Sequence, residues 1–161
     1  MSALFTLQRF PETLAVVHLG PGAEVPSWAE SSSIFSITAT ATETSLVCAA
    51  RSVPTKAQAL KPLTAFAIEG PLDFAQTGVL STMLLPLAEA EISVFTLSTF
   101  QTDWILVPVA SADRVEELWQ AQGHTVARAV PVPVSAARRK DHRRSDRKSD
   151  LKPERKKDRT K

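Results

Sequence analysis

Several residue types that support common kinds of chemistry are scarce in this chain of 161 residues. Tyrosine is absent, and Cys48 is the single cysteine, which excludes an intramolecular disulfide framework and a multi-cysteine metal site. No apolar run approaches the 18 residues of a membrane span, and residues 1–10 lack the basic start and apolar core of a signal peptide. These absences favour a cytoplasmic protein that makes no membrane contact.

Catalytic patterns are also missing. The chain has five glycines, and none of them forms a glycine-rich phosphate loop. His18 and His124 lie far apart in strand-like surroundings, and Cys48 lies in the apolar stretch 46–49, so all three are interpreted as structural residues. No metal-ligand spacing and no paired carboxylates stand out. We therefore expect a protein that is not an enzyme and needs no cofactor.

The net charge of +2 combines two unlike parts. Residues 136–161 contain 13 Lys or Arg and 5 Asp or Glu, a net charge of +8. Residues 1–135 contain 6 and 12, a net charge of −6. The basic part has one aliphatic residue larger than alanine and no aromatic residue, so it is predicted to be a disordered tail after the proline-containing linker that begins at residue 132.

Three interpretations of this tail remain open. It is a solvated segment without a specific partner, a weak electrostatic contact for nucleic acid, or a nuclear-import signal if the organism is eukaryotic. The interspersed acidic residues and the lack of an aromatic residue to stack on bases weaken the nucleic-acid interpretation.

The second half of the body has the clearer periodicity. Apolar residues predict strands at 63–68, 92–98, 104–109 and 125–130. A helical stripe covers 78–90 despite Pro86, and a second helix is expected after Ser111 as its N-cap, with Gly123 as its stop. The resulting order β-α-β-β-α-β is that of a ferredoxin-like unit, with an antiparallel sheet and two helices on one face.

The first half is less regular. Strands are expected at 13–19, 34–40 and 45–49, and short helical turns near 26–30 and 56–60. The predicted fold class is therefore α+β, with a degenerate first unit over residues 1–60, a complete second unit over 61–131, and the linker and tail over 132–161.

Several segments of the second half resemble the CASTOR-type ACT domain, which is found in small tandem ACT proteins such as the cytosolic arginine sensors. The resemblance rests on 69–74 (EGPLDF), 77–80 (TGVL), 86–90 (PLAEA), 92–95 (ISVF) and 98–107 (STFQTDWILV). The first half resembles the degenerate N-terminal unit of that family through 26–29, 35–38 and 43–48.

The resemblance implies a protein that binds a free amino acid between ACT units. Carried over by position, the ligand-binding residues are Gly78 and Val79 at the start of the first helix and Thr99, Phe100 and Asp103 in the following turn. The sequence departs from the family pattern at Phe100-Gln101 and at Trp104, so the resemblance does not imply arginine itself as the ligand.

These residue types suit an amino-acid ligand. A helix N-terminus offers amide donors to a carboxylate, and Asp103 could accept from an ammonium group. Phe100 or Trp104 could line the side-chain pocket. Each residue also has a structural interpretation: Asp103 and Asp73 as turn residues, Phe100 and Trp104 as core, Gly78 as a helix start, and Thr99 as an ordinary strand residue.

Three functions follow from these observations. The first is a regulatory or sensor protein that binds an amino acid and signals to a protein partner or through a homodimer. The second is a ligand-free interaction or assembly module with the same fold. The third, favoured least, is an RNA-associated protein that uses its basic tail.

Overall fold

The computed structural model describes residues 3–130, and the predicted tail lies outside them. The strands are β1 (Thr6–Arg9), β2 (Leu14–Leu19), β3 (Ser36–Ala39), β4 (Thr44–Ala49), β5 (Ala59–Ile68), β6 (Phe95–Ser98), β7 (Asp103–Pro108) and β8 (Thr125–Arg128). The helices are α1 (Val79–Glu89) and α2 (Ala112–Ala121), with short 3-10 helices η1 (Ser27–Ser31), η2 (Ala50–Ser52) and η3 (Val109–Ser111). None of the described helices is long and apolar enough to cross a membrane.

The second half has the predicted order, β5-α1-β6-β7-α2-β8. Gly78 is the N-cap of α1 at φ +82°, and Pro86 is accommodated inside this helix. Ser111 precedes α2, but its side chain makes no capping hydrogen bond because η3 leads directly into the helix. Gly123 follows α2 at φ +91°, a left-handed conformation that favours glycine. The predicted α+β fold class is confirmed.

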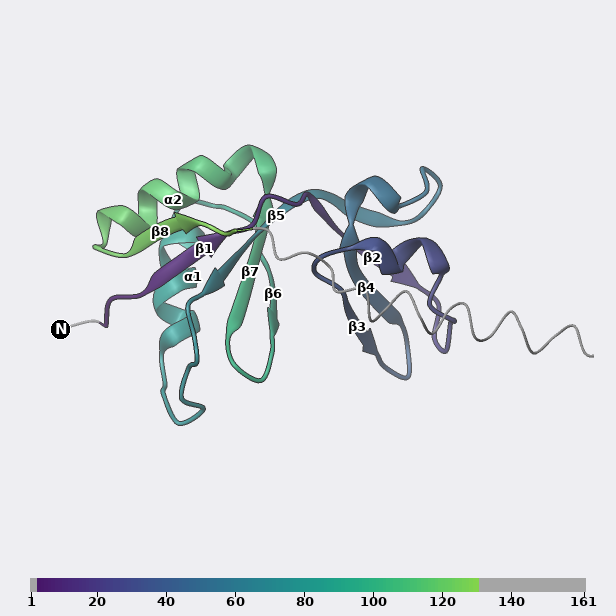
Figure 1. Cartoon of the computed structure of the whole chain (residues 1–161), viewed down its shortest axis with the longest axis horizontal. Coiled ribbons are helices and arrows are strands. Elements are labelled where there is room, and N and C mark those ends of the chain that lie inside the picture. Colours follow the sequence, from purple (N-terminus) through teal and green to yellow (C-terminus); the bar gives the residue numbers. More distant parts are fainter. Residues whose placement is uncertain (1–2, 131–161) are drawn as a thin grey trace, which may run out of the picture. The chain divides into compact units, whose positions relative to one another are not determined.

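The N-terminal strand β1 was not predicted, and it changes the sheet. It pairs antiparallel with β5 through Leu7–Ile68 and parallel with β8 through Leu7–Val126, so it lies between the first and last strands of the second unit (Figure 1). The sheet is therefore mixed, and the expectation of purely antiparallel sheets is wrong at this pair. The sequence does contain a signal for this strand, because Phe5 and Leu7 alternate with polar residues. Both residues pack in the core below the helices.

The ten-residue strand β5 joins the two halves. On one edge its first part pairs with β2 and its last part with β1, while its other edge pairs with β7. The pairing with β2 shifts register between Leu14 and Val16, near Pro62, which has no amide hydrogen to donate. All eight strands thus belong to one sheet that branches at β5. The division at residue 60 stays a prediction.

The first half contains β2, β3 and β4 with the 3-10 helices η1 and η2. The helical turn predicted at 26–30 is confirmed as η1. The one predicted at 56–60 is wrong, because Lys56 lies in a turn and Ala59 already begins β5. Hydrogen bonding of β5 to β2 overrides the weak helical preference of this short segment.

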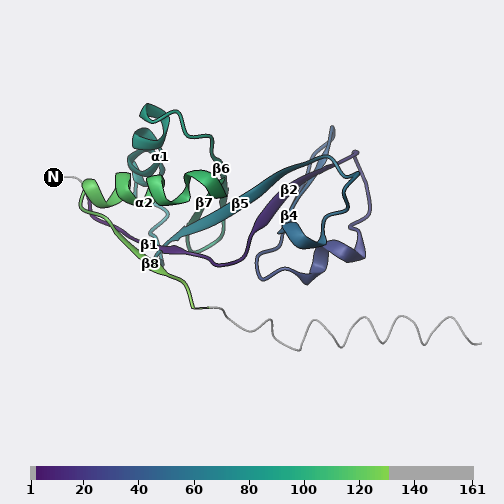
Figure 2. The ribbon, with the colours of Figure 1, turned by 90° about the horizontal axis from the view of Figure 1, so that it is seen from above.

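Three cores lie on the two faces of this sheet. The first packs both helices on one face of β1, β5 and β7 around Phe66, Met83 and Trp119 (Figure 2). The second lies between β2, β4, β5 and β7 on the opposite face. The third packs β2 and β4 against η1 and contains Cys48. The two helices therefore leave the β6–β7 end of the sheet open beside the start of α1.

Candidate ligand-binding site

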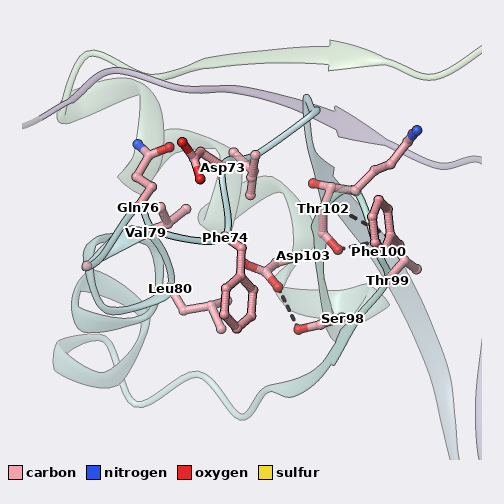
Figure 3. Close-up of a pocket in the computed structure, with 13 residues that line it drawn as sticks. Asp73, Phe74, Gln76, Val79, Leu80, Ser98, Thr99, Phe100, Thr102 and Asp103 are labelled. Carbon is pink, nitrogen blue, oxygen red and sulfur yellow. Dashed lines mark hydrogen bonds between the residues drawn. The ribbon is translucent and has the colours of Figure 1, made fainter.

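A pocket of about 330 Å³ lies between the start of α1 and the turn that joins β6 to β7 (Figure 3). The structure places all five residues expected at the ligand site on its lining: Gly78, Val79, Thr99, Phe100 and Asp103. The volume is at the lower end of the range of about 300–1,000 Å³ that is typical of small-molecule sites. The remaining lining residues are Leu72, Asp73, Phe74, Gln76, Leu80, Ser98, Gln101 and Thr102.

The first wall is the N-terminus of α1. No side chain caps this helix, so its first amides have no side-chain acceptor. The Gly78 carbonyl accepts the Thr82 amide at 3.0 Å, the Thr82 hydroxyl at 2.8 Å and the Ser81 hydroxyl at 3.0 Å. The nearby hydroxyls are thereby directed to a carbonyl, and the helix amides remain available to a carboxylate.

The second wall is the turn after β6. The Thr99 amide donates to the Thr102 carbonyl at 2.8 Å, and the Thr99 hydroxyl donates to the same carbonyl at 3.1 Å. The Thr102 amide in turn donates to the Thr99 hydroxyl at 3.3 Å. Thr99 therefore holds the turn together in addition to lining the pocket.

Asp103 begins β7 opposite Ser98, whose hydroxyl donates to Asp103 Oδ1 at 2.6 Å. Strand alternation places Asp103 on the same face as Ile105 and Val107, which pack below the helices. The carboxylate therefore faces the pocket side of the sheet (Figure 3).

Trp104 lies on the opposite face of β7. It packs in the second core, with its ring 4.7 Å from that of Phe10, and it does not belong to the lining of the pocket. The suggestion that Trp104 could shape the ligand pocket is wrong, because neighbouring residues of a strand point to opposite faces. Its structural interpretation as a core residue is confirmed.

Phe74 and Phe100 are both fully exposed at the rim of the pocket. The interpretation of Phe100 as a core residue is wrong, since it lies at the tip of the turn, beyond the last β6–β7 pair. Phe74 was not singled out as a site residue, although its position just before the helix start could have suggested it. Two exposed aromatic rings thus flank a cavity whose lining is both polar and apolar.

The loop before α1 is tied to the turn after β6. The Leu72 amide donates to the Gln101 carbonyl at 2.8 Å, and the Thr102 hydroxyl donates to the Ile68 carbonyl. A Cβ at Gly70 would lie 2.7 Å from the Gln101 carbonyl oxygen, so this close approach requires glycine. The two walls are therefore held at a fixed separation.

The charges of the lining are all negative. Asp73 and Asp103 are its charged members, and among the described residues no Lys, Arg or His contributes to it. Asp73 Oδ1 accepts the Ala75 amide at 2.9 Å, which confirms its interpretation as a turn residue. Asp103 Oδ1 accepts from the Ser98 side chain, and its Oδ2 makes no hydrogen bond among residues 3–130.

The residues considered for other chemistry lie elsewhere. Cys48 is buried in the third core, and burial raises the pKa of its thiol, with a further contribution from the Glu12 carboxylate. Burial lowers the pKa of His124, whose Nδ1 accepts the Phe5 amide at 3.2 Å. Within residues 3–130, no group of three His, Cys, Asp or Glu is arranged to hold a metal ion.

Two segments of the chain match models of known protein families. Residues 59–118 match the family model of the ACT domain. This segment has an ACT-like fold. All lining residues of the pocket fall within it, between Leu72 and Asp103. Residues 12–56 match a second family model, which describes an N-terminal domain. The narrower CASTOR-type assignment stays a prediction.

Several solved structures share the fold of this chain. Protein Atu0741 from Agobacterium tumefaciens is 25% identical, with a TM-score of 0.75 over 81% of this chain and 97% of that one. A protein of unknown function from Vibrio cholerae is 14% identical, with a TM-score of 0.60 over 73% and 88%. The regulatory subunit of aspartate kinase from Thermus flavus is 8% identical, with a TM-score of 0.53 over 74% and 98%. No protein of curated function matches the chain in sequence.

Proposed function

We propose that this protein is a non-catalytic regulatory protein that binds a free amino acid in the pocket of its ACT domain. The observation that carries the proposal is the pairing of two complementary walls around one cavity. The uncapped start of α1 supplies amide donors and a partial positive charge, and Asp103 supplies an acceptor on the opposite wall. An amino acid carries the matching carboxylate and ammonium groups.

The rest of the lining suits the side chain of such a ligand. Phe74 and Phe100 offer exposed aromatic faces, while Gln76 and Gln101 offer amide groups. Every lining residue belongs to the ACT domain, so a ligand held between ACT units would contact a second copy of the chain in addition to these two walls. Regulation would then follow if the ligand favours one arrangement of the copies over another.

A thermal-shift screen of the full chain against the twenty amino acids tests the proposal. A ligand at 100 times its Kd adds about 2.7 kcal/mol to the free energy of unfolding, which raises the Tm by roughly 5–10 °C in a chain of this size. We expect Asp103→Asn to lose the shift and Glu117→Gln to keep it, since Glu117 is an exposed carboxylate on α2 outside the pocket. A shift that survives Asp103→Asn argues against this site.

A ligand-free assembly module is the second candidate. The exposed rings of Phe74 and Phe100 favour it, because fully exposed phenylalanines on one rim can serve as contact residues. Sedimentation of the full chain without ligand separates the two candidates. A concentration-dependent oligomer that is lost in Phe100→Ser, together with no shift by any amino acid, would favour the assembly module. The RNA-associated alternative rests on the tail, outside the described residues, and stays a prediction.

A further inference from the structure

A second pocket, of about 250 Å³, opens where the chain passes from β1 to β2 beside the end of β8. It belongs to neither wall of the proposed amino-acid site. Its charged members are two arginines, Arg9 and Arg128, in contrast to the acidic lining of the first pocket. The remaining lining residues are Phe10, Pro11, Thr13, Thr64, Val109 and Ala129.

Arg9 is held in place from one side only. Its Nη1 donates to Asp113 Oδ1 at 2.7 Å and to Glu116 Oε1 at 2.6 Å, which uses both hydrogens of that nitrogen. Its guanidinium carbon lies 5.9 Å from the centre of the Phe66 ring, and its side chain is 16% exposed. The Nε–Nη2 edge makes no hydrogen bond with the described residues, although this edge has the geometry for a bidentate carboxylate.

A second guanidinium lies at the same opening. Arg128 is 69% exposed, and its Nη1 lies 3.4 Å from Glu116 Oε1, in an ion pair that satisfies no more than one of its donors. The Thr64 hydroxyl is buried and makes only a long contact of 3.4 Å with the Phe10 carbonyl. The α2 carboxylates that neutralise Arg9 are not members of the lining. Because these carboxylates balance the charge of the arginines, the case for an anion rests on the guanidinium donors that remain free and not on the net charge of the pocket.

The apolar part of the lining restricts the class of anion. Phe10, Pro11, Val109 and Ala129 supply no charged group, so an anion that is charged on all sides would be poorly matched. We infer that this pocket binds a small monocarboxylate with a short apolar body, its carboxylate on Arg9 and Arg128. The inference is independent of the amino-acid site in the ACT domain.

Calorimetric titration of the full chain with 3-methylbutanoate tests this inference, and the neutral isostere 3-methylbutanamide and inorganic phosphate serve as comparison ligands. We expect saturable binding of the carboxylate and at least about tenfold weaker binding of the amide and of phosphate, because both charge-assisted hydrogen bonds and apolar contacts are needed. No saturable binding, or equal binding of the amide or of phosphate, would overturn the inference.

Variants locate the site. Arg128→Gln should weaken binding about tenfold, whereas Arg114→Gln should leave it unchanged, since Arg114 is an exposed arginine of α2 that pairs with Glu117 outside the pocket. Arg9→Lys keeps a positive charge for Asp113 and Glu116 but lacks the bidentate edge, so it should also weaken binding. Because Arg128 is exposed, its variant stays informative even if Arg9→Lys fails to fold. Asp103→Asn should leave binding of 3-methylbutanoate unchanged. Unchanged binding in Arg128→Gln would contradict the assignment of the carboxylate to this pocket.

Discussion

Ser98 and Asp103 face each other across β6 and β7, and the Ser98 hydroxyl donates to Asp103 Oδ1 at 2.6 Å. This bond fixes the orientation of the carboxylate and occupies one of its oxygens. The other oxygen is left for a ligand on the side of the α1 N-terminus. The pair therefore links the hairpin register to the proposed ligand site.

Removing the hydroxyl from this pair should weaken ligand binding without unfolding the protein. In Ser98→Ala we expect the Kd of an amino-acid ligand to rise about three- to tenfold, the effect of one lost hydrogen bond that positions a charged group. Isothermal titration calorimetry measures this change. Thr96→Ala is the matched control, because Thr96 is an exposed hydroxyl on the same face of β6 outside the pocket. An equal effect of both variants would argue against a positioning role for Ser98.

The separation of the two pocket walls should depend on Gly70. A Cβ in Gly70→Ala would lie 2.7 Å from the Gln101 carbonyl oxygen, so the loop or the turn must move. We expect a loss of about 1–3 kcal/mol in the free energy of unfolding, typical of overpacking, together with weaker ligand binding. Urea unfolding measures the loss. Gly20→Ala is the control, because nothing lies within 4 Å of a Cβ there; similar losses in both variants would contradict the steric explanation.

The contact between the two helices should depend on the indole of Trp119. Its Nε1 donates to the Met83 carbonyl at 2.9 Å, and its ring packs edge-on against Phe66 at 5.1 Å. Trp119→Phe removes the hydrogen bond and leaves a cavity, so we expect a loss of about 2–4 kcal/mol in the free energy of unfolding. Trp28→Phe, at a half-buried position within η1, should cost less. Chemical denaturation of both variants makes the comparison.

Stability should fall as the pH falls below about 6.5, the ordinary pKa of histidine. Burial lowers the pKa of His124 in the folded state, so the unfolded chain takes up a proton at a higher pH than the folded chain does. The contribution of His124 is therefore complete above pH 6.5 and is lost as the pH falls towards the lowered pKa. The Phe5 amide, which donates to Nδ1, would lose its acceptor on protonation.

Urea unfolding at pH 7.5, 6.5 and 5.5 checks this direction. His124→Gln should abolish most of the decline across this range, while His18→Gln, at an exposed position, should retain it. Burial alone would raise the pKa of Glu12, but hydrogen bonds from Ser33, Arg51 and Ser32 outweigh it and lower this pKa. The contribution of Glu12 is therefore complete above its ordinary value near 4.5 and is lost only below it, outside the tested range. A decline that persists in His124→Gln would contradict the assignment.

The sequence predicted the elements whose signals are local. The α1 stripe around Met83, the α2 stripe around Trp119 and the strands between them follow from apolar spacing within short windows. The strand β1 was missed although Phe5 and Leu7 alternate with polar residues, because the strand has only four residues and its partners, β5 and β8, are distant in the chain. The same cause explains the error at 56–60, where pairing with β2 decides the conformation.

Some features of the candidate site could also be predicted from the sequence, and others could not. Gly78 and Asp103 were expected at the site because of the family resemblance, and both line the pocket. The bonds that hold the walls together could not be predicted, because the Leu72–Gln101 contact joins two separate loops. Trp104 was misplaced although strand alternation from Asp103 already assigns it to the other face.

The most direct test of the central claim is an amide-resolved NMR titration of the full chain with the amino acid that gives the largest thermal shift. The account predicts saturable shift changes at the amides of residues 78–81 and 99–103, which carry the two walls, and their loss in Asp103→Asn but not in Glu117→Gln. Shift changes confined to other parts of the chain, or none with any of the twenty amino acids, would contradict it.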